Sequence, residues 1–156
     1  MIELNVPGRE TLKLNYLVCD VNGTVALDGR LLDGVVRGFK TLRDRLEIHL
    51  VSADTFGTLM QINHQLEVHA HIIPPGDETT QKAEFVQRLG AEHVIAIGQG
   101  ANDRAMLQTA AIGICILSRE GAASETLMSA DVIVPDIVAA LELLEKPLRM
   151  IATLRK

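Results

Sequence analysis

The sequence is poor in aromatic residues: it contains no tryptophan, one tyrosine and three phenylalanines among 156 residues. A core built from this chain must therefore be aliphatic, and apolar residues make up 47% of the chain, enough to fill one core. No apolar run reaches the roughly 18 residues of a membrane-spanning helix, and the N-terminus shows no apolar stretch of a signal peptide. We therefore expect a single domain over residues 1–156 that lies in the cytoplasm and contacts no membrane.

The chain also lacks an excess of positive charge and a framework of paired cysteines. Its 15 Lys and Arg residues face 20 Asp and Glu residues, which gives a net charge of −5 and argues against non-specific binding to nucleic acid. Cys19 and Cys115 each lie inside an apolar run, so we expect two free thiols in the core, as suits a reducing compartment.

Short apolar runs alternate along the chain with apolar residues at helical spacing. The runs predict strands at 14–19, 48–51, 68–73, 94–97, 112–117 and 132–134. The helical spacing predicts helices within 35–46, 59–66, 83–89 and 137–144. Near-continuous apolar strands are typical of parallel strands covered on both faces, so the pattern predicts an α/β fold with a doubly wound parallel sheet.

Two hairpin signals interrupt this alternation. Leu4–Val6 and Leu12–Leu14 flank Pro7-Gly8, which predicts an antiparallel pair near the N-terminus. Asp28-Gly29 lies between two apolar pairs, which predicts a tight hairpin over Thr24–Leu32. Because this second hairpin directly follows the first buried strand, it should overhang the carboxyl edge of the sheet.

Polar side chains follow three of the predicted strands where each strand ends. In an open parallel sheet, ligands bind outside the carboxyl ends of the strands, so these side chains should meet at one site. They are Asp20, Asn22 and Thr24 after the first strand, Ser52 and Asp54 after the second, and Gln99, Asn102 and Asp103 after the fourth; Lys82 lies in the helix before the fourth strand.

Residues of these types suit phosphoryl transfer, which needs a nucleophile, groups that hold phosphoryl oxygens, a cation and usually Mg²⁺ on carboxylates. Asp20 can be the nucleophile, Ser52 can donate to a phosphoryl oxygen, and Lys82 can offset the negative charge. Asp103 can supply a carboxylate to the metal ion. Each residue also has a structural interpretation: a turn at Asp20, a helix N-cap at Ser52 and Asp54, a solvated surface lysine at Lys82. Only the combination of these residues, in this order and at strand ends, is specific for phosphoryl transfer.

The order and spacing of these residues resemble the haloacid dehalogenase (HAD) superfamily, and within it the phosphorylation domain of P-type ATPases. Asp20-Val-Asn-Gly-Thr24 is similar to the nucleophile motif Asp-x-Asp/Thr-Gly-Thr, and Ser52-Ala-Asp54 is similar to Thr-Gly-Asp. Pro75 to Lys82 resembles the stretch before the motif lysine. Gly98-Gln-Gly-Ala-Asn-Asp103 is similar to Gly-Asp-Gly-x-Asn-Asp. The resemblance covers about residues 14–155, nearly the whole chain.

The resemblance implies a three-layer Rossmann-like fold, dependence on Mg²⁺ and an aspartyl-phosphate intermediate. It also implies a role for each motif residue. The expected catalytic residues are Asp20, Asn22, Ser52 and Lys82; the phosphate-binding residues are Val21, Asn22, Ser52, Ala53 and Lys82; and the metal ligands are Asp20, Asn22 through its carbonyl group, Gln99 and Asp103.

Two positions depart from the motifs of the family. Asn22 stands where the family's phosphatases have a second Asp that acts as general acid and base, and an amide cannot carry that proton. Gln99 replaces a magnesium-ligating Asp, and a neutral amide oxygen is a poorer ligand for a hard cation. We therefore expect a slow phosphatase or phosphotransferase that acts on a phosphorylated small molecule or protein. The alternative is a catalytically degenerate binding or regulatory module on the same fold.

The chain has no segment long enough for a cap domain or for the nucleotide-binding insert of the ATPases. Asp20 and Ser52 are only 32 residues apart, and the motif lysine follows 30 residues later. A capless site needs a neighbouring subunit or a large substrate to exclude water. Leu27, Leu31 and Leu32 should be exposed on the hairpin and would gain from a subunit contact, so we expect a homo-oligomer.

Overall fold

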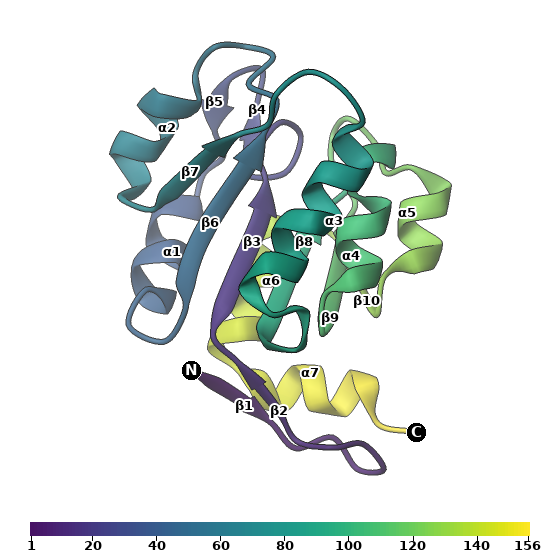
Figure 1. Ribbon diagram of the computed structural model, residues 1–156. Coiled ribbons are helices and arrows are strands. Elements are labelled where there is room, and N and C mark those ends of the chain that lie inside the picture. The colour runs from purple at the N-terminus through teal and green to yellow at the C-terminus, as the bar shows by residue number, and fades with distance from the viewer.

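The computed structural model describes residues 1–156, and its centre is a six-stranded parallel sheet (Figure 1). The strand order is β10-β9-β8-β3-β6-β7, and every neighbouring pair is parallel, so the carboxyl ends of all six strands share one edge. The strands are β3 (Tyr16–Asp20), β6 (Glu47–Ser52), β7 (His69–Ile72), β8 (Val94–Gly98), β9 (Ile112–Ile116) and β10 (Val132–Val134).

Helices cover both faces of this sheet and make a three-layer structure (Figure 1). One face carries α3 (Glu78–Leu89), α4 (Arg104–Thr109) and α5 (Ser124–Ser129). The other face carries α1 (Val35–Leu42), α2 (Leu59–Leu66) and α6 (Ile137–Glu145). The last helix, α7 (Pro147–Leu154), packs against α6 and the N-terminal strand, and two 3₁₀ turns, η1 (Ala91–His93) and η2 (Ala101–Asp103), flank β8. None of the helices has the length and apolar composition that crossing a bilayer requires.

The core is aliphatic and is split between the two faces by the alternation of strand side chains. Leu17 and Cys19 of β3 pack into the larger cluster, together with Phe39 of α1, the one fully buried aromatic residue. Val18, between them, points the other way and packs with Val86 of α3. Both cysteines are free and buried, as the sequence predicted. The middle strand is thus covered on both sides, which explains its continuous apolar sequence.

The predicted α/β class with a parallel sheet is confirmed, and the helix at 59–66 and the strand at 132–134 have the predicted bounds. Helix α3 begins five residues before the predicted start, because the Asp77 side chain caps it by accepting from the Thr80 N–H at 3.1 Å. Helices α4, α5 and α7 were not predicted. Helices α4 and α5 have six residues each, less than two turns, which is too few to show a helical period in the sequence.

Both predicted hairpins are present. Strands β1 (Ile2–Leu4) and β2 (Leu12–Leu14) pair antiparallel beside α7, at the end of the molecule away from the carboxyl edge (Figure 1). Strands β4 (Ala26–Leu27) and β5 (Arg30–Leu31) form the second hairpin, whose turn residues Asp28 and Gly29 both have positive φ, at 50° and 76°. The leucines of this hairpin were expected to be exposed, but they are half-buried because they line a cavity described below.

Candidate active site

Asp20 is the last residue of β3 and lies at the middle of the carboxyl edge, between β6 and β8. The residue is 7% exposed. Thr24 Oγ1 donates to Asp20 Oδ2 at 3.0 Å, and Lys82 Nζ donates to Asp20 Oδ1 at 2.7 Å. Hydrogen bonds therefore orient both carboxylate oxygens, as a nucleophile held in one direction requires.

Lys82 joins this carboxylate to a second one. Its Nζ also donates to Asp103 Oδ1 at 2.7 Å, and the lysine is only 1% exposed while Asp103 has no exposed surface. The other oxygen of Asp103, Oδ2, accepts the N–H groups of Gln99 at 2.9 Å and Gly100 at 3.0 Å. One ammonium group thus connects the end of β3, helix α3 and the loop after β8.

Burial and mutual charge change the pKa values of these groups. Burial, followed by the negative charge of Asp103, raises the pKa of Asp20 to about 6, although Lys82 and Thr24 act in the opposite direction. Burial alone would lower the pKa of Lys82, but the two carboxylates outweigh it and hold that pKa above its ordinary value. The lysine is therefore charged at every physiological pH, and Asp20 is mostly ionised at neutral pH.

Ser52 ends β6 on one side of Asp20 and is buried. Its Oγ accepts the N–H of Asp54 at 2.9 Å, which leaves the hydroxyl proton free to donate to a ligand. Asp54 has positive φ and accepts the N–H of Leu59, at the start of α2, at 2.9 Å. Of the two residues, Asp54 has the helix-capping role that the sequence left open, and Ser52 keeps the position expected of a phosphate-binding hydroxyl.

The loop after Asp20 is a tight turn. The carbonyl oxygen of Val21 accepts the N–H groups of Thr24, Val25 and Ala26, and the turn passes through Gly23, whose φ is +79°. The N–H groups of Val21 and Asn22, and that of Ala53 in the neighbouring loop, donate to no backbone oxygen of the chain. These three donors at the carboxyl edge are the groups that the sequence predicted to bind phosphoryl oxygens.

Gln99 lies against the same turn. Its Nε2 donates to the carbonyl oxygen of Asn22 at 3.3 Å and to Glu120 Oε2 at 3.4 Å. Sequence reasoning missed Glu120, which stands in the loop after β9 outside every motif, and it gave no role to Thr24, although the motif contains it. Only the fold brings the Glu120 loop to this edge.

Comparisons with known proteins bear on the family and the fold of the chain. No protein-family model matches the chain. The uncharacterized protein MJ0073 of Methanocaldococcus jannaschii is 42% identical over 84 residues, which are 51% of this chain and 90% of that protein, so the two belong to one family. A phosphoserine phosphatase of Archaeoglobus fulgidus is 33% identical over 88 residues, 53% of this chain and 26% of the enzyme.

Two solved structures share the whole fold. The 3-deoxy-D-manno-octulosonate 8-phosphate phosphatase of Moraxella catarrhalis, in complex with magnesium and phosphate, matches with a TM-score of 0.68 and 18% identity over 91% of this chain and 94% of that one. A phospho-aspartyl intermediate analogue of phosphoserine phosphatase matches with a TM-score of 0.67 and 15% identity, over 86% and 99% of the two chains. The chain thus has the fold of the haloacid dehalogenase (HAD) superfamily of phosphatases.

The groups around Asn22 could hold a hard divalent cation, although only one of them carries a charge. The carboxylate of Asp20, the carbonyl oxygen of Asn22 and the amide of Gln99 are oxygen ligands of the kind that Mg²⁺ prefers. Asp103, which the sequence also suggested as a ligand, already has both oxygens bonded, to Lys82 and to backbone N–H groups. No three His, Cys, Asp or Glu side chains form a metal-binding cluster. An ion would therefore depend on Asp20 and on neutral oxygens.

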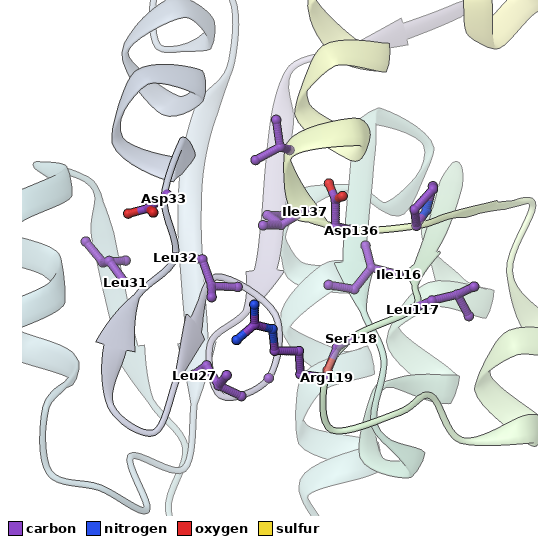
Figure 2. A pocket seen from close by; sticks show the side chains of 13 residues that line it. Leu27, Leu31, Leu32, Asp33, Ile116, Leu117, Ser118, Arg119, Asp136 and Ile137 are labelled. Atoms are coloured by element: carbon purple, nitrogen blue, oxygen red, sulfur yellow. The ribbon is translucent and has the colours of Figure 1, made fainter.

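A cavity of about 590 Å³ adjoins the loop after Asp20 (Figure 2). It lies between the β4–β5 hairpin, the loop after β9 and the start of α6, and Gly23 forms part of its wall. In Figure 2 the Arg119 side chain reaches toward Leu27 and Leu32 across this space. The cavity is lined by apolar side chains together with one cationic group, Arg119, and two carboxylates, Asp33 and Asp136, and none of the expected catalytic side chains lines it. The named side chains on its wall are Leu27, Leu31, Leu32, Asp33, Ile116, Leu117, Ser118, Arg119, Asp136 and Ile137.

The buried ion triad predicts a pH-dependent stability defect in Lys82→Met. At neutral pH this variant should lose about 3–5 kcal/mol in the free energy of unfolding, because two buried carboxylates then face each other without a cation. Removal of the lysine should raise the pKa of Asp20 above its wild-type value of about 6. The loss should therefore shrink as the pH falls from neutral toward about 6, because Asp20 of the variant takes up a proton there that the wild type does not, and this protonation removes the repulsion. Urea unfolding at several pH values measures this. Lys40→Met, at an exposed position of α1, is the control, and an equal loss at every pH would contradict the prediction.

Proposed function

We propose that this HAD protein is a Mg²⁺-dependent phosphatase that hydrolyses a phosphate monoester through an aspartyl-phosphate on Asp20. The observation that carries the proposal is the environment of that carboxylate. Asp20 lies at the centre of the carboxyl edge, both of its oxygens are oriented by donors, and a buried lysine is its cationic partner. A carboxylate fixed in this way is suited to attack a phosphorus atom.

The chain's own groups account for the first chemical step. One carboxylate oxygen of Asp20 forms a bond to phosphorus, and the bond between phosphorus and the ester oxygen breaks. The hydroxyl of Ser52 and the N–H groups of Asn22 and Ala53 hold the phosphoryl oxygens, while Lys82 balances the charge of the nucleophile and the phosphoryl group together. Mg²⁺, held by Asp20, the carbonyl of Asn22 and the amide of Gln99, would neutralise further charge on the phosphoryl group.

The proton for the leaving oxygen has no dedicated donor. The side chain of Asn22 is an amide and cannot give up a proton to the ester oxygen or take one from the attacking water. Water must therefore supply the proton, and a second water must cleave the acyl-phosphate bond and return Asp20 as a free carboxylate. Both steps are slow without a general acid and base, so the aspartyl-phosphate should be long-lived.

The cavity beside Gly23 supports a substrate whose leaving group has an apolar part. Its walls are leucine and isoleucine side chains with Arg119 and the two carboxylates Asp33 and Asp136 among them, and it adjoins the loop that would bind the phosphoryl group. A phosphorylated small molecule fits a volume of about 590 Å³. A phosphorylated side chain on a protein could use the same space, because no cap domain closes the edge.

The proposal predicts that Asp20→Asn abolishes phosphate release. Wild-type protein should hydrolyse p-nitrophenyl phosphate in the presence of Mg²⁺, and it should gain one phosphoryl group when it is incubated with acetyl phosphate and quenched in acid. Both signals should vanish in Asp20→Asn, because an amide does not form the acyl-phosphate. Asp44→Asn, an exposed change of the same kind after α1, should leave both signals unaltered. Turnover that survives in Asp20→Asn would remove Asp20 from the mechanism.

A second prediction concerns the missing general acid. Asn22→Asp should raise kcat for p-nitrophenyl phosphate by about 10²–10⁴-fold, because a carboxyl group at that position can protonate the leaving oxygen and then activate water. The lifetime of the aspartyl-phosphate should fall by a similar factor. Single-turnover and steady-state assays measure the two quantities.

The alternative is a binding or regulatory module, and the neutral side chains at Asn22 and Gln99 are the observation that favours it. If a folded wild-type protein releases no phosphate and Asn22→Asp does not create turnover, this second function becomes the better one.

We also propose that the protein acts in the cytoplasm as a homo-oligomer. Two buried free cysteines suit a reducing compartment. The half-buried leucines of the β4–β5 hairpin and the exposed Leu117 stand around an open cavity, which a second subunit would help to close. Light scattering should therefore give a mass of at least two chains. A single-chain mass at all concentrations would contradict the proposal.

A further inference from the structure

We propose that Glu120 is a magnesium ligand that supplies the negative charge which Gln99 does not. This inference rests on the proposed Mg²⁺ site but adds a residue from outside every sequence motif. Its starting point is the Gln99 amide, whose Nε2 faces two oxygens at once, the Asn22 carbonyl at 3.3 Å and Glu120 Oε2 at 3.4 Å.

The backbone around Glu120 is held in place relative to the site. Its own N–H donates to Ser118 Oγ at 2.9 Å, and Gly121, with φ of +80°, turns the chain back toward β8. The N–H of Ala123 then donates to the carbonyl oxygen of Gln99 at 2.9 Å. Glu120 therefore stands on a loop that is hydrogen-bonded directly to Gln99, the position at which a charged metal ligand is absent.

The Glu120 carboxylate lies directly against the nucleophile loop. A Cβ atom at Gly23 would stand 2.2 Å from Glu120 Oε2 and 2.4 Å from Gln99 Nε2, so only glycine leaves space for this approach without a shift. The positive φ of Gly23 favours glycine for a separate reason. The turn after Asp20 thus admits a carboxylate beside the Asn22 carbonyl, on the side of the turn where a metal ion would bind.

The two contacts of the Gln99 amide are long for hydrogen bonds, and both acceptors are oxygens that suit Mg²⁺. Rotation of the Gln99 side-chain amide by half a turn brings Oε1 to the position of Nε2. Three oxygens then face the same region: Gln99 Oε1, the carbonyl oxygen of Asn22 and the charged carboxylate of Glu120. Asp20, Asp103 and Glu120 do not form a cluster of metal-binding geometry in this structure. Glu120 is exposed, however, and an exposed side chain changes rotamer readily, so an ion can draw it inward.

The experiment measures metal binding on the full chain without substrate. Mn²⁺ binding is followed by electron paramagnetic resonance, and Mg²⁺ binding by calorimetry and by competition with Mn²⁺. Glu120→Gln should weaken the affinity for both ions by about 10–100-fold, because it removes a charge next to the ion while it keeps the shape of the side chain. Glu10→Gln, an exposed change in the β1–β2 turn at the other end of the molecule, should leave both affinities within a factor of about two.

A charge-swap variant tests the role more sharply. Gln99→Asp combined with Glu120→Gln keeps the net charge of the wild type and moves the carboxylate to position 99. If Glu120 acts as the replacement ligand, this double variant should recover at least the wild-type affinity. Recovery by the double variant supports the inference, and an affinity as low as that of Glu120→Gln alone overturns it.

The outcome does not depend on turnover. Equal metal affinities in wild type and Glu120→Gln, or a wild type that binds neither ion, would overturn the inference. If turnover is Mg²⁺-dependent and Glu120→Gln leaves the affinity unchanged, the phosphatase proposal stands and Glu120 is not a ligand. If Glu120→Gln weakens metal binding but no phosphate is released, the ligand assignment stands and the phosphatase proposal fails.

Discussion

Lys82 donates to Asp20 and to Asp103 from a position with almost no contact with water, and the rest of the site is arranged around this ion triad. Burying three charges is costly, and the cost is offset only when each charge has partners at hydrogen-bond distance. Two carboxylates and one ammonium leave one negative charge over. Burial, and after it the charge of Asp103, raises the pKa of Asp20, and a bound metal ion would offset the remaining negative charge.

The backbone around the triad has the conformation that these hydrogen bonds require. Asp103 can accept the N–H groups of Gln99 and Gly100 only because the loop after β8 folds back over it. Gly98 permits this, since a Cβ there would lie 2.6 Å from the Asp103 carboxyl carbon. The glycines at 23 and 98 thus serve close approach, of Glu120 in the first case and of Asp103 in the second. The hydrogen bonds of the motif residues and the close packing of the loops at the carboxyl edge therefore depend on each other.

Neutral side chains at Asn22 and Gln99 change the charge of the site and leave its architecture intact. Neither side chain takes part in the triad: the carbonyl oxygen of Asn22 accepts from the Gln99 side chain at 3.3 Å, and the backbone N–H of Gln99 donates to Asp103 at 2.9 Å. The fold can therefore keep Asp20 oriented whether or not positions 22 and 99 carry the acidic side chains that we propose catalysis and metal binding would use. This separation explains how one framework can support an active phosphatase, a slow one or a binding module, and why the chemistry must be argued from the individual residues.

The parallel sheet, the place of Asp20 at the end of its first strand and the joining of Ser52, Lys82 and Asp103 at one edge could all be predicted from the sequence. These follow from local patterns, because continuous apolar runs mark buried strands and polar residues at strand ends share an edge in any parallel sheet. Three contacts could not be predicted without the folded chain: Lys82 bridges two carboxylates, the hairpin leucines line a cavity and Glu120 lies against Gly23. Those contacts join residues from loops of different strands, and no periodicity or motif encodes the distance between such loops.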